Sequence, residues 1–364
     1  MRWVVNKRKM EDVQKNFGNK RKKEEKKNKK KRGLLIAVII CILLDFGASL
    51  CLFFAYGPIT YFRDLLITTA MTTKSHKYLA RTIYSEKTIE KVINSNYVVD
   101  IKENTNVDDI QIGSSDEITE YESIYDEQIL KRNPNDLYKM IPLEGDGYKG
   151  YLVAIYDPSR ISLVSSRYYG NWGQYLEEIA KQHKAKVGIN ASGFDDTNQV
   201  GNGAKAAGIF IKGGKLIEGK PNTIAKLIGF NKEHVLMLMN ATAQEAISQG
   251  MVDAVEFGPF LIVNGKPAEM KGNGGWGISS RTAIAQRKDG IVLFLVIDGR
   301  QPGYSMGTNI REITKILLRY KAYNAANLDG GASSSLNIEG KLVSKPCAVS
   351  PKGERPIPNA WIVK

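Results

Sequence analysis

The stretch NAANLDGGASSSL, residues 324–336, decides the fold, because it places many polar groups directly beside an apolar run. The apolar run ends in Asp329, the Gly330-Gly331 pair lets the backbone turn sharply, and three serines follow before Leu336. Glycine adopts positive φ and lets a ligand approach the backbone, so this pair could present N–H groups to an anion. Asp-Gly is equally a signal for a tight hairpin, and these residues alone leave both interpretations open.

Apolar segments before this stretch predict how it joins a sheet. Residues 291–297 (IVLFLVI) are continuously apolar, which is typical of a central strand buried on both faces. Asn309 and Glu312 mark a helix start, and the helix carries an apolar stripe made of Ile310, Ile313, Ile316, Leu317 and Tyr320. The chain then returns in a strand at 325–328. Since strand, helix, strand connections favour parallel neighbours, we expect the two strands to pair in parallel.

Polar residues follow three of the expected strands. The strand at 291–297 ends in Asp298-Gly299-Arg300, its expected neighbour ends in Asp329-Gly330-Gly331, and a strand at 186–189 ends in Asn190. Ligands bind beyond the carboxyl ends of strands in such sheets. We therefore expect these three strand ends to share one pocket.

From residue 148 onward, short apolar segments alternate with glycine turns. Three hairpins, at 208–217, 259–266 and 335–343, share an apolar strand, a glycine turn and a lysine, and their uneven spacing argues against a solenoid. Further helices are expected at 171–183 and after a capping box at Thr242 and Glu245. The predicted class is α+β, with a mixed β-sheet core, packed helices and glycine-turn hairpins.

The net charge of +14 is concentrated at the N-terminus. Residues 1–32 contain 15 Lys or Arg and 4 Asp or Glu, a net charge of +11, which leaves 14 − 11 = +3 for the remaining 332 residues. The positive charge forms an N-terminal tail and does not extend over the rest of the chain, where a binding surface would lie. We therefore expect no nucleic-acid partner.

The next segment predicts a membrane span. Leu34–Tyr56 gives 23 largely apolar residues, about 35 Å of helix against a hydrocarbon core of about 30 Å. The preceding lysines predict a cytoplasmic N-terminus and an extracellular C-terminal part. A cleavable signal peptide is the alternative, but the run is long for one and no Ala-x-Ala signal follows Tyr56. Asp45 within the span is a tolerated polar residue, a protonated carboxyl group or a partner for another helix.

These features divide the chain into four parts. We expect a basic cytoplasmic tail (1–32), a transmembrane helix (33–56), an extracellular helical stalk with an acidic linker (57–147) and a catalytic domain (148–364). Cys41 and Cys51 fall in the span and only Cys347 lies outside, so no disulfide within one chain can crosslink the outer part.

The candidate chemistry combines two carboxylates with two arginines. Carboxylates in different environments can divide acid from base or nucleophile, as glycoside hydrolysis usually requires, which suits Asp298 and Asp329. Arg281 and Arg300 could hold an anionic group through their planar guanidinium groups, although each could equally be a structural ion-pair partner. Further donors are expected from Gly330, Gly331, Ser333 and Ser334.

Other sites find less support in the sequence. No G-x-S-x-G elbow, H-E-x-x-H or paired-Cys pattern is present, which argues against a serine hydrolase and a zinc site. The stretch at 195–198 (DDTN) and the acidic run at 100–127 offer oxygen ligands for a divalent cation such as calcium, but a solvated turn and a solvated linker explain them as well. We expect no required cofactor.

Several short motifs follow one another along the chain in the order found in a known family. They are 189–194 (INASGF), 258–261 (GPFL), 280–284 (SRTAI), 296–300 (VIDGR), 307–308 (GT) and 327–334 (NLDGGASS). Together they resemble the phosphodiester glycosidase family, which includes N-acetylglucosamine-1-phosphodiester alpha-N-acetylglucosaminidases and bacterial proteins labelled exopolysaccharide biosynthesis proteins. The resemblance covers about residues 148–364.

The resemblance implies hydrolysis of the bond between a sugar's anomeric carbon and a phosphodiester. Carried onto this chain, it implies catalytic roles for Asn190, Arg281, Asp298 and Asp329. It implies substrate or phosphate binding by Arg300, Gly330, Gly331, Ser333, Ser334, Thr282 and Gly299. Family members commonly have Asn-Gly-Gly-Phe-Phe where this chain has NASGFD at 190–195, a change at the pocket rim that leaves the sugar open.

We therefore expect a membrane-anchored extracellular glycosidase acting on sugar-1-phosphodiesters of a cell-envelope or exopolysaccharide glycan. Two alternatives use the same features: a non-catalytic protein that binds anionic glycans during assembly, and a transferase that moves the glycosyl group to another acceptor. The sequence does not indicate an oligomeric state.

Overall fold

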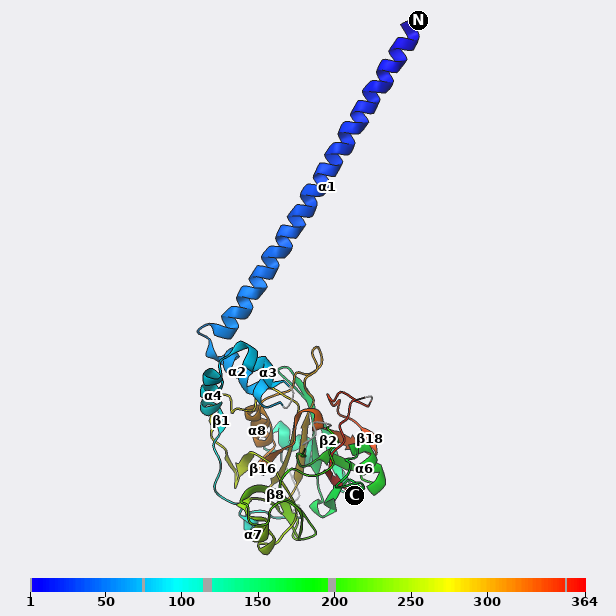
Figure 1. Cartoon of the computed structure of the whole chain (residues 1–364). Coiled ribbons are helices and arrows are strands. Elements are labelled where there is room, and N and C mark those ends of the chain that lie inside the picture. The colour runs from blue at the N-terminus through cyan, green and yellow to red at the C-terminus, as the bar shows by residue number, and fades with distance from the viewer. Residues whose placement is uncertain (1, 74–75, 114–119, 196–200, 351) are drawn as a thin grey trace. The chain divides into compact units, whose positions relative to one another are not determined.

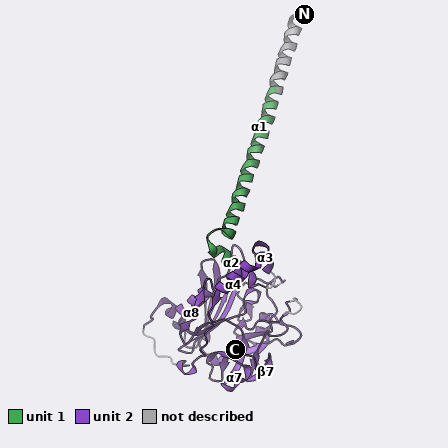
Figure 2. Ribbon diagram, turned by 60° about the vertical axis from the view of Figure 1, so that its left-hand side comes forward, with its two compact units in different colours: residues 1–63 green, residues 64–364 purple. Residues whose placement is uncertain are grey.

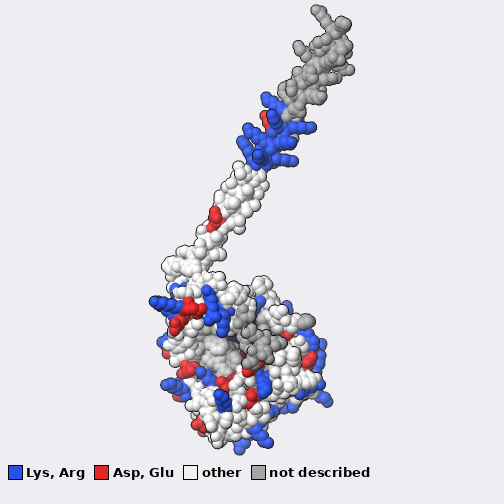
Figure 3. Space-filling model, in the orientation of Figure 1, with Lys and Arg blue, Asp and Glu red and all other residues white. Residues whose placement is uncertain are grey.

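The computed structural model describes residues 2–73, 76–113, 120–195, 201–350 and 352–364 (Figure 1). The chain divides into two compact units, Met1–Arg63 and Asp64–Lys364 (Figure 2). The first contains the long helix α1 (Arg2–Tyr56) and the start of α2 (Thr60–Met71). Within the described residues, one helix, Lys20–Tyr56 of α1, is long and apolar enough to cross a membrane or act as a signal anchor. Figure 3 shows that the described part of this helix begins with a basic segment and is almost uncharged beyond it.

The second unit is built on a seven-stranded sheet in the order β12-β11-β16-β14-β15-β3-β2. Its strands are β2 (Tyr138–Gly145), β3 (Tyr148–Ile155), β11 (Phe260–Val263), β12 (Lys266–Pro267), β14 (Arg281–Arg287), β15 (Val292–Ile297) and β16 (Ala322–Leu328). Residues of β15 are buried along its whole length, as expected for a central strand covered on both faces.

Three smaller sheets complete the unit. One five-stranded sheet contains β4 (Ile161–Ser165), β5 (Val187–Asn190), β17 (Leu336–Ile338), β18 (Lys341–Leu342) and β19 (Asn359–Val363). The other contains β6 (Phe210–Lys212), β7 (Lys215–Glu218), β8 (Ala225–Asn231), β9 (Leu236–Ala241) and β10 (Met251–Glu256). A two-stranded sheet pairs β1 (Tyr97–Val98) with β13 (Met270–Lys271).

Helices and single helical turns connect the strands of these sheets. They are α3 (Lys77–Ile83), α4 (Glu86–Ser95), α5 (Ile124–Leu130), α6 (Leu176–His183), α7 (Ala243–Ser248) and α8 (Ile310–Arg319), with single turns η1 (Val107–Asp109), η2 (Pro158–Arg160) and η3 (Gly331–Ser333). The capping box at Thr242 and the cap at Asn309 are confirmed. The helix expected at 171–183 begins only at Leu176, because Gln174 instead bridges to Ile357.

The α+β class is confirmed, but the expected mixed pairing is wrong: the paired strands of the described residues are all antiparallel. The strands expected to be parallel neighbours, β15 and β16, are separated by β14. A turn through Asp289 and Gly290 makes β14 and β15 a hairpin, and α8 then leads the chain to the far side of β14. Because β15 and β16 both run antiparallel to β14, their carboxyl ends still reach the same edge as Arg281.

The seven-stranded sheet has a core on each face. One face packs through Ile284 and Phe294 against residues of both five-stranded sheets, including Ile189 and Ile228. The other face packs through Ala283, Ala285 and Leu295 against the apolar stripe of α8. The three predicted glycine-turn hairpins are confirmed as β6-β7, β11-β12 and β17-β18.

Residues 64–147, expected as a stalk and linker, lie in the same compact unit as residues 148–364. Strand β2 extends the main sheet beyond β3, and β1 pairs with β13. Asp126 of the acidic run is buried and forms an ion pair with Arg287 at 3.2 Å, so part of that run is structural rather than solvated.

The glycine-rich loop 272–277 (GNGGWG) is held against this N-terminal segment. The hydroxyl of Thr69 accepts a hydrogen bond from the Ile278 amide at 3.1 Å, and the Asn273 side chain donates to Thr68 at 3.0 Å. A Cβ on Gly277 would lie 2.4 Å from the Cα of Thr69, which real side chains do not tolerate. The close approach of α2 therefore requires glycine at this position.

Replacing Gly277 by alanine should destabilise the protein more than the same change at Gly213. Both residues have nearly the same positive φ, +56° and +57°, but a Cβ on Gly213 meets nothing within 4 Å. Gly213→Ala should cost about 1–2 kcal/mol for the left-handed backbone alone, and Gly277→Ala about 1–3 kcal/mol more for the clash. Chemical unfolding of the detergent-solubilised full chain measures both; equal losses would contradict this packing.

Candidate active site

The site is assembled around the side chain of Asn190, which is fully buried at the end of β5. Its Nδ2 donates to the carbonyl of Asp329 at 2.6 Å. Its Oδ1 accepts from the hydroxyl of Thr282 at 2.8 Å and from the amide of Ser335 at 3.1 Å. Asn190 thus joins two sheets to the turn after β16. These contacts occupy the side chain for which the resemblance implies a catalytic role.

The turn after β16 is a single helical turn, η3, fixed by its neighbours. The amide of Asp329 donates to the carbonyl of Ala191 at 3.3 Å. Gly331, at φ +62°, donates its N–H to the carbonyl of Ser280 at 3.0 Å, and the Ser280 hydroxyl returns a bond to the Gly331 carbonyl at 2.7 Å. The Gly331 amide is therefore engaged within the protein, contrary to the expected phosphate contact, whereas the Gly330 amide donates to no described residue.

Arg281 is a buried cation held by backbone carbonyls. Its Nε donates to Thr308 at 3.1 Å, and its Nη2 donates to the carbonyls of Trp276 and Gly277 at 2.5 and 2.7 Å. Among the residues that the structure describes, Nη1 donates no hydrogen bond and no carboxylate pairs with Arg281. A Cβ on Gly330 would lie 3.9 Å from Nη1, so this nitrogen faces the turn.

Arg300 adds a second cation at the same turn. It has a φ of +58°, and its Nε donates to the hydroxyl of Ser279 at 3.1 Å. A Cβ on Gly331 would lie 2.9 Å from an Arg300 Nη atom, so the guanidinium group lies against this turn. Burial, reinforced by the charge of Arg300, lowers the pKa of Arg281 to about 9, which leaves the guanidinium charged at neutral pH.

The two candidate carboxylates have different surroundings. Asp298 is buried, and its oxygens accept from the amide of Lys345 and the hydroxyl of Tyr304, both at 2.9 Å. Burial raises the pKa of Asp298, although these two hydrogen bonds oppose the shift. Asp329 is only partly buried and lies next to Gly330. The two carboxylates are therefore suited to different roles.

The remaining predicted residues lie around the turn. Gly299 packs so tightly that a Cβ would lie 2.3 Å from the Ser280 amide. Ser333 and Ser334 are buried, and within the described part of the chain the Ser334 hydroxyl has no hydrogen-bond partner. The sequence did not reveal Tyr304 and Lys345 as partners of Asp298, since their spacing follows no motif.

A metal site finds no support in the described residues, where no three His, Cys, Asp or Glu side chains are grouped to hold an ion. Most of the stretch 195–198 considered for a cation lies outside the described residues.

Comparisons with known proteins place these features among relatives. Residues 183–364 match the phosphodiester glycosidase family model. The SPbeta prophage-derived uncharacterized protein YomE of Bacillus subtilis (strain 168) is 29% identical over 199 residues, 52% of this chain and 30% of that protein. The N-acetylglucosamine-1-phosphodiester alpha-N-acetylglucosaminidase of Bos taurus is 38% identical over 69 residues, 19% of this chain and 13% of that protein. The chain thus matches less than a third of the length of these relatives.

One solved structure supports the fold. The catalytic domain of zebrafish N-acetylglucosamine-1-phosphodiester alpha-N-acetylglucosaminidase, auto-inhibited by its pro-peptide, aligns with a TM-score of 0.52 at 22% identity. The alignment covers 64% of this chain and 85% of that chain. At this identity the likeness shows the fold alone.

Replacing Asn190 by alanine should destabilise the protein, because Asn190 joins β5, β14 and the turn after β16. The change leaves the Asp329 carbonyl, the Thr282 hydroxyl and the Ser335 amide without their partner, and should lower the free energy of unfolding by about 2–4 kcal/mol. The exposed Asn222→Ala is the control and should change stability by about 0.5 kcal/mol or less. If denaturant unfolding gave the two variants the same stability, Asn190 would not hold the site together.

Proposed function

Because this chain belongs to the phosphodiester glycosidase family, we propose that it hydrolyses the bond between a sugar's anomeric carbon and a phosphodiester. One observation carries the proposal: Arg281 is a buried cation, it has no carboxylate partner among the described residues, and it faces a turn beside a second arginine. A buried charge without a partner is costly, and an anionic substrate would supply the missing partner.

In this proposal the phosphodiester lies between the two arginines and the turn. Arg281 donates through Nη1, Arg300 through its outer guanidinium nitrogens, and Gly330 through its amide. The unpaired Ser334 hydroxyl and the neighbouring Ser333 supply further donors. Such charge-assisted bonds stabilise the phosphate monoester that leaves with the oxygen and the electron pair of the broken C–O bond, while water supplies the new hydroxyl of the sugar.

Asp329 then serves as the base or nucleophile at the anomeric carbon. Its backbone is fixed on both sides, through its amide to Ala191 and through its carbonyl to Asn190. Asp298 is less suited to attack, because it is more buried than Asp329 and burial favours its uncharged form. We assign Asp298 to holding Tyr304 and the loop after β15. We assign Asn190, Thr282 and Gly299 to positioning the residues of the site.

Assays on methyl phosphodiesters of sugar 1-phosphates, beginning with N-acetylglucosamine, test these assignments. Arg281→Gln should lower kcat/KM by about 10²–10³-fold, as for the loss of one transition-state donor. Asp329→Asn should lower kcat by at least about 10³-fold. Arg319→Gln removes a surface cation of α8 and is the matched control.

The same assay separates the rival functions. If the Asp329→Asn variant released sugar at the wild-type rate, the proposed role of Asp329 would be overturned. Tight binding of the phosphodiester without any release would instead support a non-catalytic binding protein, and transfer to an added glycan acceptor would identify a transferase.

We further propose that the protein is anchored in a membrane by α1 and acts outside the cell on a cell-envelope or exopolysaccharide glycan. The basic segment before the apolar run supports a cytoplasmic N-terminus. Protease added to intact expressing cells should remove residues after 57 and leave an N-terminal tag protected. Digestion of the tag together with protection of the C-terminal part would reverse this topology.

A further inference from the structure

We propose that a cleft beside Arg281 binds the neutral saccharide chain of the substrate, and that residues 93–100 of the N-terminal segment form one of its walls. The cleft has a volume of about 870 Å³, in the range of about 300–1,000 Å³ typical of ligand pockets. This inference rests on the proposed function, because it assigns the part of the substrate that lies away from the phosphodiester.

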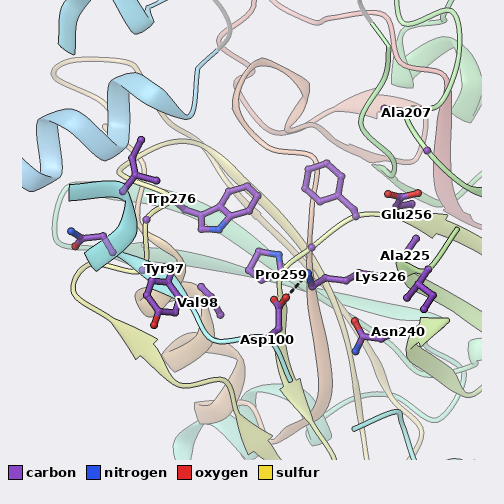
Figure 4. Close-up of a pocket in the computed structure, with 18 residues that line it drawn as sticks. Tyr97, Val98, Asp100, Ala207, Ala225, Lys226, Asn240, Glu256, Pro259 and Trp276 are labelled. Atoms are coloured by element: carbon purple, nitrogen blue, oxygen red, sulfur yellow. Dashed lines mark hydrogen bonds and ion pairs between the residues drawn. The ribbon is translucent and has the colours of Figure 1, made fainter. Parts of the chain in front are cut away.

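The cleft is formed by segments far apart in the sequence. Residues 93–100 and the loop 274–276 line one side, Gly258 and Pro259 lie between them and β8, and Lys226 and Glu256 line the other side. Figure 4 shows Tyr97, Trp276 and Lys226 around this space, with the dashed line marking the ion pair of Lys226 with Asp100.

Two hydrogen bonds connect the cleft to the candidate active site. The carbonyl of Trp276 accepts from Nη2 of Arg281 at 2.5 Å, and the guanidinium carbon lies 6.0 Å from the centre of the Trp276 ring. The carbonyl of Gly258 accepts from the side chain of Asn327, two residues before Asp329, at 3.0 Å. The wall of the cleft is thus in contact with Arg281 and with the strand that leads to Asp329, and we place the phosphodiester at Arg281 and the saccharide in the cleft.

The lining chemistry favours a neutral saccharide. The rings of Trp276 and Phe257 lie 6.5 Å apart, and Tyr97 is 45% exposed, so aromatic surfaces are available for the apolar faces of sugars. Lys226 is neutralised by Asp100 at 2.9 Å, and Glu256 accepts from the Ile209 amide at 2.8 Å. One lysine against two carboxylates leaves no excess positive charge for an anionic polymer, and these polar groups disfavour an acyl chain.

The wall formed by residues 93–100 is firmly attached. Strand β1 pairs with β13, and the amide of Asn273 donates to the side chain of Asn96 at 2.8 Å. A Cβ on Gly275 would lie 2.2 Å from the Asn96 carbonyl, so the two segments touch directly. This wall precedes residues 183–364, which match the family model.

Direct binding tests this assignment without requiring turnover. The detergent-solubilised full chain is titrated with neutral tetrasaccharides of N-acetylglucosamine, glucose and galactose, and with poly(glycerol phosphate) as the anionic comparison. Tyr97→Ser and Ile224→Arg should each weaken binding of the preferred tetrasaccharide by about tenfold. Ile224 lines the cleft and is 72% exposed, so its replacement leaves the core intact.

Tyr168→Ser, at a tyrosine 50% exposed outside the cleft, is the matched control and should bind as the wild type does. Failure of every tetrasaccharide to bind, unchanged affinity in both cleft variants, or preference for poly(glycerol phosphate) would overturn the cleft assignment. Tetrasaccharide binding without phosphodiester cleavage would contradict the proposed function and leave the cleft standing, whereas cleavage without such binding would do the reverse.

Discussion

The buried amide of Asn190 is the constraint on which the rest of the site depends. Three hydrogen bonds from one side chain connect β5, β14 and the turn after β16. Thr282 and Ser335 are buried and Asp329 is partly buried, and a buried polar group that loses its partner is destabilised by its uncompensated desolvation. The position of Asp329 therefore follows from Asn190 rather than from the turn alone, and the glycines only permit the close packing.

A second constraint is electrostatic. Proteins rarely bury a cation without an acidic partner, because the carbonyl dipoles that hold it do not neutralise its charge. Here three carbonyls fix the direction of Arg281, and the loop that supplies two of them is packed against the N-terminal segment through Thr69 and Asn96. The segment outside the family-matched region thus supports both the orientation of Arg281 and the wall of the neighbouring cleft.

The sequence predicted the α+β class, the central strand β15, the α8 stripe and the three hairpins, since each depends on local periodicity and turn residues. It missed the insertion of β14 between β15 and β16, because strand order depends on long-range pairing. It predicted a helical stalk and an acidic linker over residues 57–147, although β2 and Asp126 are integrated by contacts far away in sequence. The engagement of the Gly331 amide and the partners of Asp298 likewise depend on tertiary contacts that no motif encodes.

The central claim is that Arg281 and the turn at Gly330 form an anion site beside Asp329. A crystal structure of the full chain with a bound sugar 1-phosphate tests it most directly. We expect phosphate oxygens within about 3.2 Å of Arg281 Nη1 and of the Gly330 amide, with the sugar directed toward Trp276. A phosphate bound elsewhere, or a protein carboxylate hydrogen-bonded to Arg281 Nη1 in place of the ligand, would contradict this anion site.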